Sequence, residues 1–165
     1  MKYRLVKISN LSGNKASVYS VLLNGEQETI FDKFVKENIM TFEEEVKNII
    51  ARLKTIGKST GIRDSFVKPN EGTLGDGVCA LYDNPDKKLR LYCIKYGTQL
   101  ILVGGGGQKN VRTLQEDDKL KKENYFLRKL SAQITERIKD KEIEYINNYL
   151  DFEGDLEFQD DDEND

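Results

Sequence analysis

Apolar residues at the start of the chain alternate with polar ones, which is the pattern of a half-buried β-strand. Two such stretches, residues 2–8 and 16–23, predict a pair of strands joined by a turn at 12–14. A second turn at Asn24-Gly25 follows, and residues 29–37 carry apolar side chains on one side of a short helix. The first part of the chain therefore predicts an N-terminal hairpin followed by a helix.

A second helix is predicted from the apolar residues between Val46 and Leu53, which recur at i, i+3, i+4 and i+7. Thr41 and Glu44 have the spacing of a capping box at its start. Gly57 is a natural helix stop. The sequence thus predicts two consecutive helices.

Three strands are predicted in the middle of the chain, after a polar loop at 58–76. They are residues 78–82, 89–96 and 99–103, and the last two are joined by a tight hairpin at Gly97. Residues 99–103 are apolar on both faces, as expected of a central strand.

The C-terminal part predicts a long helix capped by Asp117 or Asp118, and residues 143–150 continue at helical spacing after a break. In the long helix, Tyr125 and Phe126 are expected to pack in the core and at its edge. The acidic residues 151–165 predict a disordered tail. The expected organisation is one α+β domain over residues 1–150, followed by the tail.

The composition fits one globular domain, with 38% hydrophobic and 33% charged residues among 165. It includes two cysteines and no histidine. We interpret the cysteines as reduced core thiols, and the chain has no apolar run long enough to cross a bilayer, so we expect a cytoplasmic protein. Without histidine, we expect no metal or other cofactor, and proton transfer would fall to Lys, Arg, Tyr, Asp or Glu.

The charge is divided unevenly along the chain. Residues 151–165 carry nine acids and no base, which leaves 26 basic and 20 acidic residues, a net charge of +6, in residues 1–150. A basic body predicts an anionic partner. One hypothesis is that the acidic tail folds back on the basic face and mimics RNA.

The basic charge is concentrated between Lys87 and Arg112, a stretch that contains six basic residues and no acid. The six are Lys87, Lys88, Arg90, Lys95, Lys109 and Arg112. Strand alternation places Lys88, Arg90, Tyr92 and Tyr96 on one face. Cations neutralise phosphates and rings stack on unpaired bases, so this face suits RNA. The same pattern also fits an ordinary solvated strand face.

A run of four glycines, Gly104–Gly107, precedes Lys109. Consecutive glycines let backbone N–H groups approach an anion. The run is not a P-loop, because Gln108 separates Gly107 from the lysine and Asn110 replaces the hydroxyl residue. It predicts either a flexible or closely packed bend after the strand, or a nucleotide site.

Four short features follow one another in the middle of the chain: GDGVCALY at 75–82, LRLY at 89–92, LILV at 100–103, and Lys109. Together they resemble the RelE/ParE toxin superfamily, and its HigB-like branch in particular. The resemblance implies a curved antiparallel sheet packed against helices. It also implies a type II toxin that cleaves mRNA, often on the ribosome, without a metal. The ribose 2′-OH would attack the adjacent phosphate, and a helix-turn-helix antitoxin would be the protein partner.

The resemblance assigns Arg90 to the scissile phosphate and Lys109 to charge neutralisation. Tyr92 and Tyr96 join them, from their predicted face, as stacking groups or a proton donor. Further RNA contacts are expected from Lys87, Lys88, Lys95 and Arg112. Tyr82 and the glycine run replace side chains that the family uses. The alternative is therefore a non-catalytic basic module of the same fold that binds an antitoxin, RNA or another partner.

Overall fold

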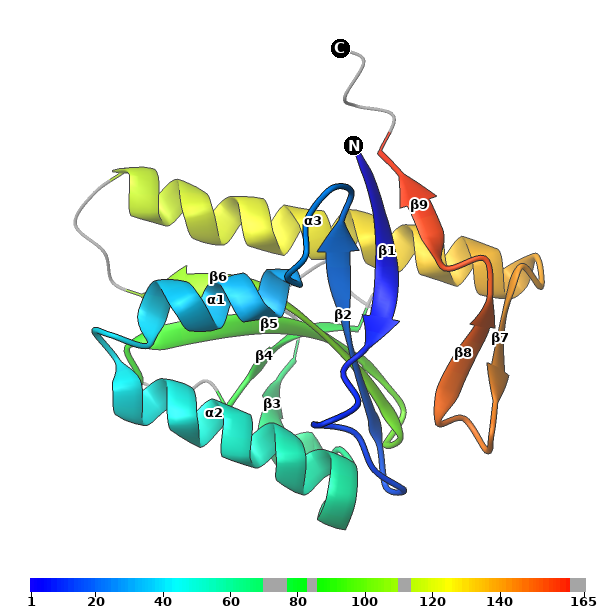
Figure 1. The fold of residues 1–165 in the computed structure, drawn as a ribbon, viewed down its shortest axis with the longest axis horizontal. Coiled ribbons are helices and arrows are strands. Elements are labelled where there is room, and N and C mark those ends of the chain that lie inside the picture. The colour runs from blue at the N-terminus through cyan, green and yellow to red at the C-terminus, as the bar shows by residue number, and fades with distance from the viewer. Residues whose placement is uncertain (70–76, 83–85, 110–113, 161–165) are drawn as a thin grey trace.

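The computed structural model describes residues 1–69, 77–82, 86–109 and 114–160, with side chains in the long third helix from Asp118 onward. These residues form an α+β fold with a mostly antiparallel sheet (Figure 1). The strands are β1 (Lys2–Lys7), β2 (Ser17–Leu23), β3 (Val67–Lys68), β4 (Val78–Leu81), β5 (Leu89–Tyr96), β6 (Leu100–Gln108), β7 (Ile143–Ile146), β8 (Asp151–Gly154) and β9 (Glu157–Gln159). The helices are α1 (Ile30–Asn38), α2 (Glu43–Thr55), the π-helix η1 (Ile56–Thr60), the 3₁₀-helix η2 (Asp64–Phe66) and α3 (Leu114–Lys139).

Seven strands form one sheet in the order β3-β4-β5-β6-β2-β1-β9, and β7 pairs with β8 in a separate hairpin. Strands β4, β5 and β6 are an antiparallel meander, and β2 joins β6 in parallel from Ser17↔Leu100 to Tyr19↔Leu102. Strand β9 pairs with β1, so the two ends of the described chain lie side by side (Figure 1).

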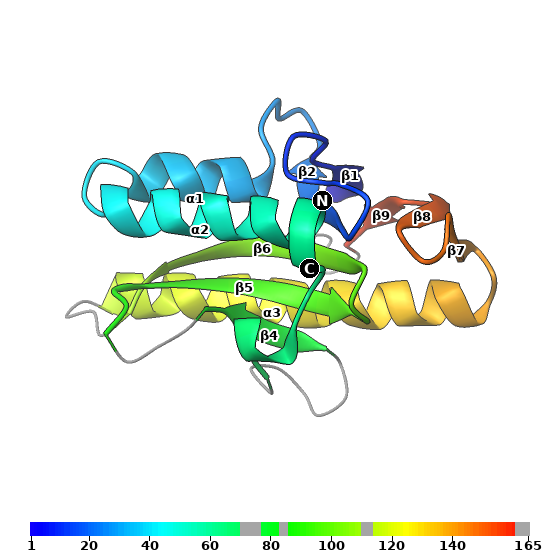
Figure 2. The same ribbon diagram turned by 90° about the horizontal axis from the view of Figure 1, so that it is seen from below.

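Helices cover both faces of the sheet: α1 and α2 lie on one side of β5 and β6, and α3 lies on the other (Figure 2). Alternation along β5 supplies both layers. Leu91 and Cys93 pack with α1 and α2, whereas Tyr92 and Ile94 pack with α3. The sheet is therefore central, and its middle strands are buried on both faces except near their ends, where Arg90, Lys95, Tyr96 and Gln108 are partly or fully exposed.

The two predicted helices α1 and α2 are present, but the capping box lies at a different helix. In α1, Thr29 Oγ1 accepts from the Asp32 amide at 3.1 Å and the Asp32 carboxylate accepts from the Thr29 amide at 3.0 Å. The box predicted at Thr41 is wrong, because Phe42 occupies the N-cap of α2 and makes no side-chain cap. Its amide donates to Asn38 O at 2.8 Å, so the link between α1 and α2 is too tight for Thr41 to cap.

Gly57, predicted to end α2, instead lies inside η1, and the chain leaves this turn at Gly61 with φ +72°. The carbonyl of Gly57 accepts from the amides of Lys15 and Ala16 at 3.0 and 3.1 Å. The missing side chain lets the β1–β2 connection approach this closely.

The helix predicted at 143–150 is wrong, because this segment forms the β7–β8 hairpin. Residues 147–149 all have positive φ, between 54 and 68°, which turns the chain sharply. The apolar residues that suggested a helix are used in a strand pairing, with Ile143 and Phe152 buried in the core that α3 covers.

The acidic tail is ordered over its first ten residues, which corrects the prediction of disorder for 151–160. Phe152 and Phe158 are 5% and 3% exposed, so alternation buries the apolar residues of β8 and β9 while Glu153 and Glu157 are exposed. Residues 161–165 of the predicted tail and 70–76 of the predicted loop lie outside the described residues. Helix α3 begins at Leu114, so Asp117 and Asp118 are within it and do not cap it.

Candidate functional site

Four of the predicted cations meet where β5 begins and β6 ends, and we call Lys87, Lys88, Arg90 and Lys109 the basic strand end. The amide of Lys109 donates to the Lys88 carbonyl at 2.8 Å, and Arg90 is the cross-strand partner of Gly107. Directly opposed residues point to the same face of a sheet. Lys88, Arg90 and Lys109 therefore share the face on which α3 lies.

The start of β5 is held by Glu45 from the first turn of α2. Its two carboxylate oxygens each accept from the Lys88 amide at 3.0 Å, and one also accepts from the Leu89 amide at 3.2 Å. These charge-assisted hydrogen bonds fix the backbone from which Lys88 and Arg90 project.

The two tyrosines do not join this cluster. Tyr92 is 5% exposed and packs in the core with Leu127 and Leu130 of α3. The prediction that Tyr92 lies on an open face is therefore wrong. Tyr96 lies six positions from Arg90 along β5, which is about 20 Å in an extended strand. The centroid of its ring lies 5.2 Å from the ring centroid of Phe152 in the β7–β8 hairpin. Sequence alternation identified the face correctly but could not show that a helix covers it.

The two remaining predicted RNA contacts, Lys95 and Arg112, are not part of the basic strand end as the structure describes it. Lys95 is near the opposite end of β5 and forms an ion pair with Asp64 at 3.4 Å. Arg112 lies outside the described residues. Of the eight predicted site residues, the structure thus brings together Lys88, Arg90 and Lys109, with Lys87 next to Lys88 in the chain.

The glycine run is part of β6 and is buried, which excludes a flexible bend and confirms close packing. A Cβ on Gly104 would lie 2.8 Å from Leu127 Cδ1, and one on Gly106 would meet the Arg90 carbonyl oxygen. A Cβ on Gly105 would overlap the Glu123 carboxylate. Because a carboxylate covers Gly105, the run does not form a phosphate cradle there.

A charged cluster that sequence reasoning missed lies beside the glycines. Lys119 Nζ is 3.2 Å from Glu37 of α1 and 3.6 Å from Glu123. Burial is the main cause that raises the pKa of Glu123, with the negative charge of Glu37 adding to it while Lys119 opposes it. The available signal was an i,i+4 Lys–Glu pair in a helix that follows a glycine-rich strand.

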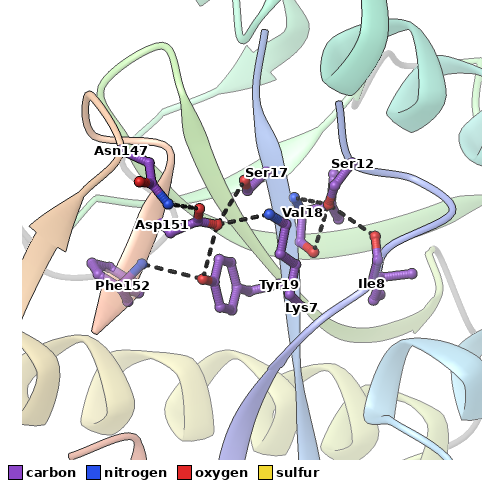
Figure 3. A network of polar contacts seen from close by, with 9 residues as sticks. All are labelled: Lys7, Ile8, Ser12, Ser17, Val18, Tyr19, Asn147, Asp151 and Phe152. Carbon is purple, nitrogen blue, oxygen red and sulfur yellow. Dashed lines mark hydrogen bonds and ion pairs between the residues drawn. The ribbon is translucent and has the colours of Figure 1, made fainter. Parts of the chain in front are cut away.

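The C-terminal hairpin is fastened to the sheet by Asp151 (Figure 3). Its Oδ1 accepts from Lys7 Nζ at 2.8 Å, Ser17 Oγ at 3.3 Å and Tyr19 OH at 3.4 Å, and its Oδ2 accepts from Asn147 Nδ2 at 2.8 Å. Tyr19 OH in turn accepts from the Phe152 amide. This network is structural, since it joins β8 to β1 and β2 away from the basic strand end.

Among the described residues, no group of three or more Cys, Asp or Glu side chains could hold a metal ion, and no helix could span a membrane. Comparisons with protein-family models, with curated proteins and with solved structures found no significant match. The functional interpretation therefore rests on the residues of this chain.

Proposed function

We propose that this chain is the toxin of a type II toxin–antitoxin system, of the RelE/ParE superfamily and its HigB-like branch, and that it binds and cleaves mRNA. The observation that carries the proposal is the basic strand end, where Lys88 and Arg90 at the start of β5 and Lys109 just after β6 share one face. Such a cluster offers several cations to one or two adjacent phosphates.

The order of elements supports the same proposal. A helical pair, α1 and α2, precedes three antiparallel strands, β4 to β6, which lead into α3. This is the order that the sequence resemblance implies. The N-terminal hairpin of β1 and β2 and the C-terminal strands β7 to β9 are additions to that unit.

The proposed reaction is attack of a ribose 2′-OH on the adjacent phosphorus. A new P–O2′ bond forms, the P–O5′ bond breaks, and the proton lost by O2′ is balanced by one gained at O5′. Arg90 and Lys109 would stabilise the negative charge that develops on the phosphoryl oxygens. With Tyr92 buried and Tyr96 distant, Lys88 and Lys109 are the proton carriers we propose at this site.

A non-catalytic RNA- or antitoxin-binding module is the alternative, and one observation favours it. The placement of both tyrosines takes the two predicted phenol groups away from the basic strand end. Phosphate binding needs cations alone, whereas cleavage also needs proton transfer, which without the tyrosines falls to the two lysines. Under either function the expected partners are RNA or ribosome-bound mRNA and a helix-turn-helix antitoxin in the cytoplasm.

The proposal is tested by titrating a short fluorescein-labelled single-stranded RNA with the full chain and following anisotropy over a range of salt concentrations. The double variant Arg90→Ala/Lys109→Ala should weaken binding and reduce the salt slope by about 1.4, since each phosphate contact contributes about 0.7. Lys54→Ala, which removes an exposed lysine near the end of α2, is the matched control. Absence of RNA binding by the unmodified chain would contradict the toxin proposal and the RNA-binding form of the alternative.

A further inference from the structure

The solvent face of α3 carries an aromatic ring surrounded by cations. Tyr125, predicted to pack at the core or its edge, is 55% exposed. Lys121 and Lys122 precede it by four and three positions, and Arg128 and Lys129 follow it by three and four. Residues at these spacings are neighbours on one helix face. We call these five residues the α3 patch.

The patch is compact. Its ends are eight residues apart, about 12 Å along a helix, and Arg128 Cζ lies 5.3 Å from the Tyr125 ring centroid. Asp118 and Glu136, whose side chains the structure describes, lie seven and eleven positions from Tyr125 along the helix. The aromatic ring thus has cations on both sides along the helix axis.

One corner of the patch already contacts an anionic group. Lys129 Nζ lies 3.0 Å from Asp160 Oδ1, at the end of β9, while the Lys129 side chain remains 46% exposed. The position therefore accepts a carboxylate from a segment remote in sequence, and it retains surface for a further anion.

We propose that the α3 patch binds an unpaired RNA segment, with one base stacked on Tyr125 and the flanking phosphates neutralised by the four cations. The proposal rests on the RNA-binding function above and extends the site along α3. Lys119 packs against Gly107 beside the basic strand end, and Lys121 follows two positions later. The first turns of α3 therefore lie beside the basic strand end, and the proposed RNA strand would pass from there around the helix to reach the patch on its solvent face.

The pattern favours unpaired RNA over two other anionic partners. An interfacial membrane helix inserts a broad apolar face, whereas the apolar face of α3 is buried against the sheet with Leu127, Leu130 and Ile134. A duplex hides the faces of its bases, so a central ring would gain no stacking partner.

The test is an anisotropy titration of the full chain with a fluorescein-labelled single-stranded oligoadenylate and with an RNA duplex of equal length. Tyr125→Ala should raise the Kd for the single strand by about five-fold or more and change duplex binding less. Tyr149→Ala is the matched control, because Tyr149 is 64% exposed in the β7–β8 turn. Lys121→Gln/Lys122→Gln should reduce the salt slope for the single strand by about 1.4.

The results separate this inference from the proposed function. If Tyr125→Ala binds the oligoadenylate like Tyr149→Ala while Arg90→Ala/Lys109→Ala weakens it, the α3 patch is not a binding site although RNA binding stands. If the unmodified chain binds no RNA, both proposals fall. Tyr125-dependent binding to phosphatidylserine vesicles without RNA binding would also overturn the inference. Urea unfolding of each variant confirms that the fold is retained.

Discussion

Gly106 lies directly against the backbone carbonyl of Arg90, closer than any residue with a side chain could lie. The contact falls where the register between β5 and β6 shifts, between Leu91 and Cys93. The glycine run therefore sets the backbone position of Arg90, the central cation of the basic strand end. In this way a sequence feature that suggests a loop serves as a packing element beneath the proposed site.

Gly106→Ala should therefore destabilise the protein by about 2 kcal/mol, because the new methyl group meets backbone atoms that cannot rotate away. Gly107→Ala is the matched control, since its Cβ would be 3.6 Å from Lys119 Cδ, an ordinary contact. Urea unfolding measures both free energies. Equal stabilities of the two variants would contradict the close packing of Gly106.

Glu123→Gln should become more stable relative to the unmodified chain as the pH rises. The raised pKa of Glu123 means that its neutral form is favoured in the folded state, so this contribution is full at low pH and is lost as the carboxyl ionises. Lys119, Glu37 and Lys33 are the charged groups that act on it. Urea unfolding between about pH 4 and pH 7 measures the difference.

The control for this measurement is Glu136→Gln, which neutralises an exposed glutamate on the same helix. Its stability relative to the unmodified chain should change less over the same pH range. A Glu123→Gln variant that loses relative stability with rising pH would show that the ion pair with Lys119 outweighs burial.

Asp151→Ala should lower the free energy of unfolding at neutral pH by about 1–3 kcal/mol, because four donors lose their acceptor. Burial opposes ionisation of Asp151, but hydrogen bonds from Lys7 and Asn147 lower its pKa overall. Its stabilisation is thus present at neutral pH and lost as the pH falls through that lowered pKa.

Urea unfolding at about pH 7 and pH 3 should show the gap between the unmodified chain and Asp151→Ala narrowing at the lower pH. Glu153→Gln, an exposed change on the same strand, is the control. A stability difference that is the same at both pH values would contradict a stabilising role of the ionised Asp151 carboxylate in the hairpin.

Cys79 and Cys93 should react slowly with a small thiol reagent in the folded protein and rapidly in urea. Both thiols are buried cross-strand partners with their sulfurs 3.0 Å apart. The hydrogen bond with Cys79, together with burial, raises the pKa of the Cys93 thiol well above its usual value, so little thiolate forms. Fast labelling of the native chain would contradict this burial.

The sequence predicted elements whose periodicity is local. Strand β5 has the predicted bounds, and the N-terminal hairpin, α1, α2 and α3 are all present near their predicted positions. Burial along β5 follows the predicted alternation, with Leu91 and Tyr92 on opposite faces. The proximity of Lys88, Arg90 and Lys109 also follows from strand pairing alone.

The burial of Tyr92 and of the glycine run, and the order of β8 and β9, depend on tertiary packing that the sequence pattern does not reveal. Tyr92 has the position of a surface residue until α3 is placed over it, and Gly104–Gly107 resembles a loop until the helix approaches. In β8 and β9, two buried phenylalanines, Phe152 and Phe158, order a segment whose acidic composition predicts disorder. Each case needed a partner element that lies far away in the sequence.

The measurement that tests the central claim most directly is inducible expression of the chain in bacteria, with growth and primer extension on cellular mRNA followed together. The toxin account predicts growth arrest with new mRNA ends, relief of both by Arg90→Ala/Lys109→Ala, and persistence of both in the control Lys54→Ala. Unimpaired growth with intact mRNA on expression of the folded, unmodified chain would contradict it.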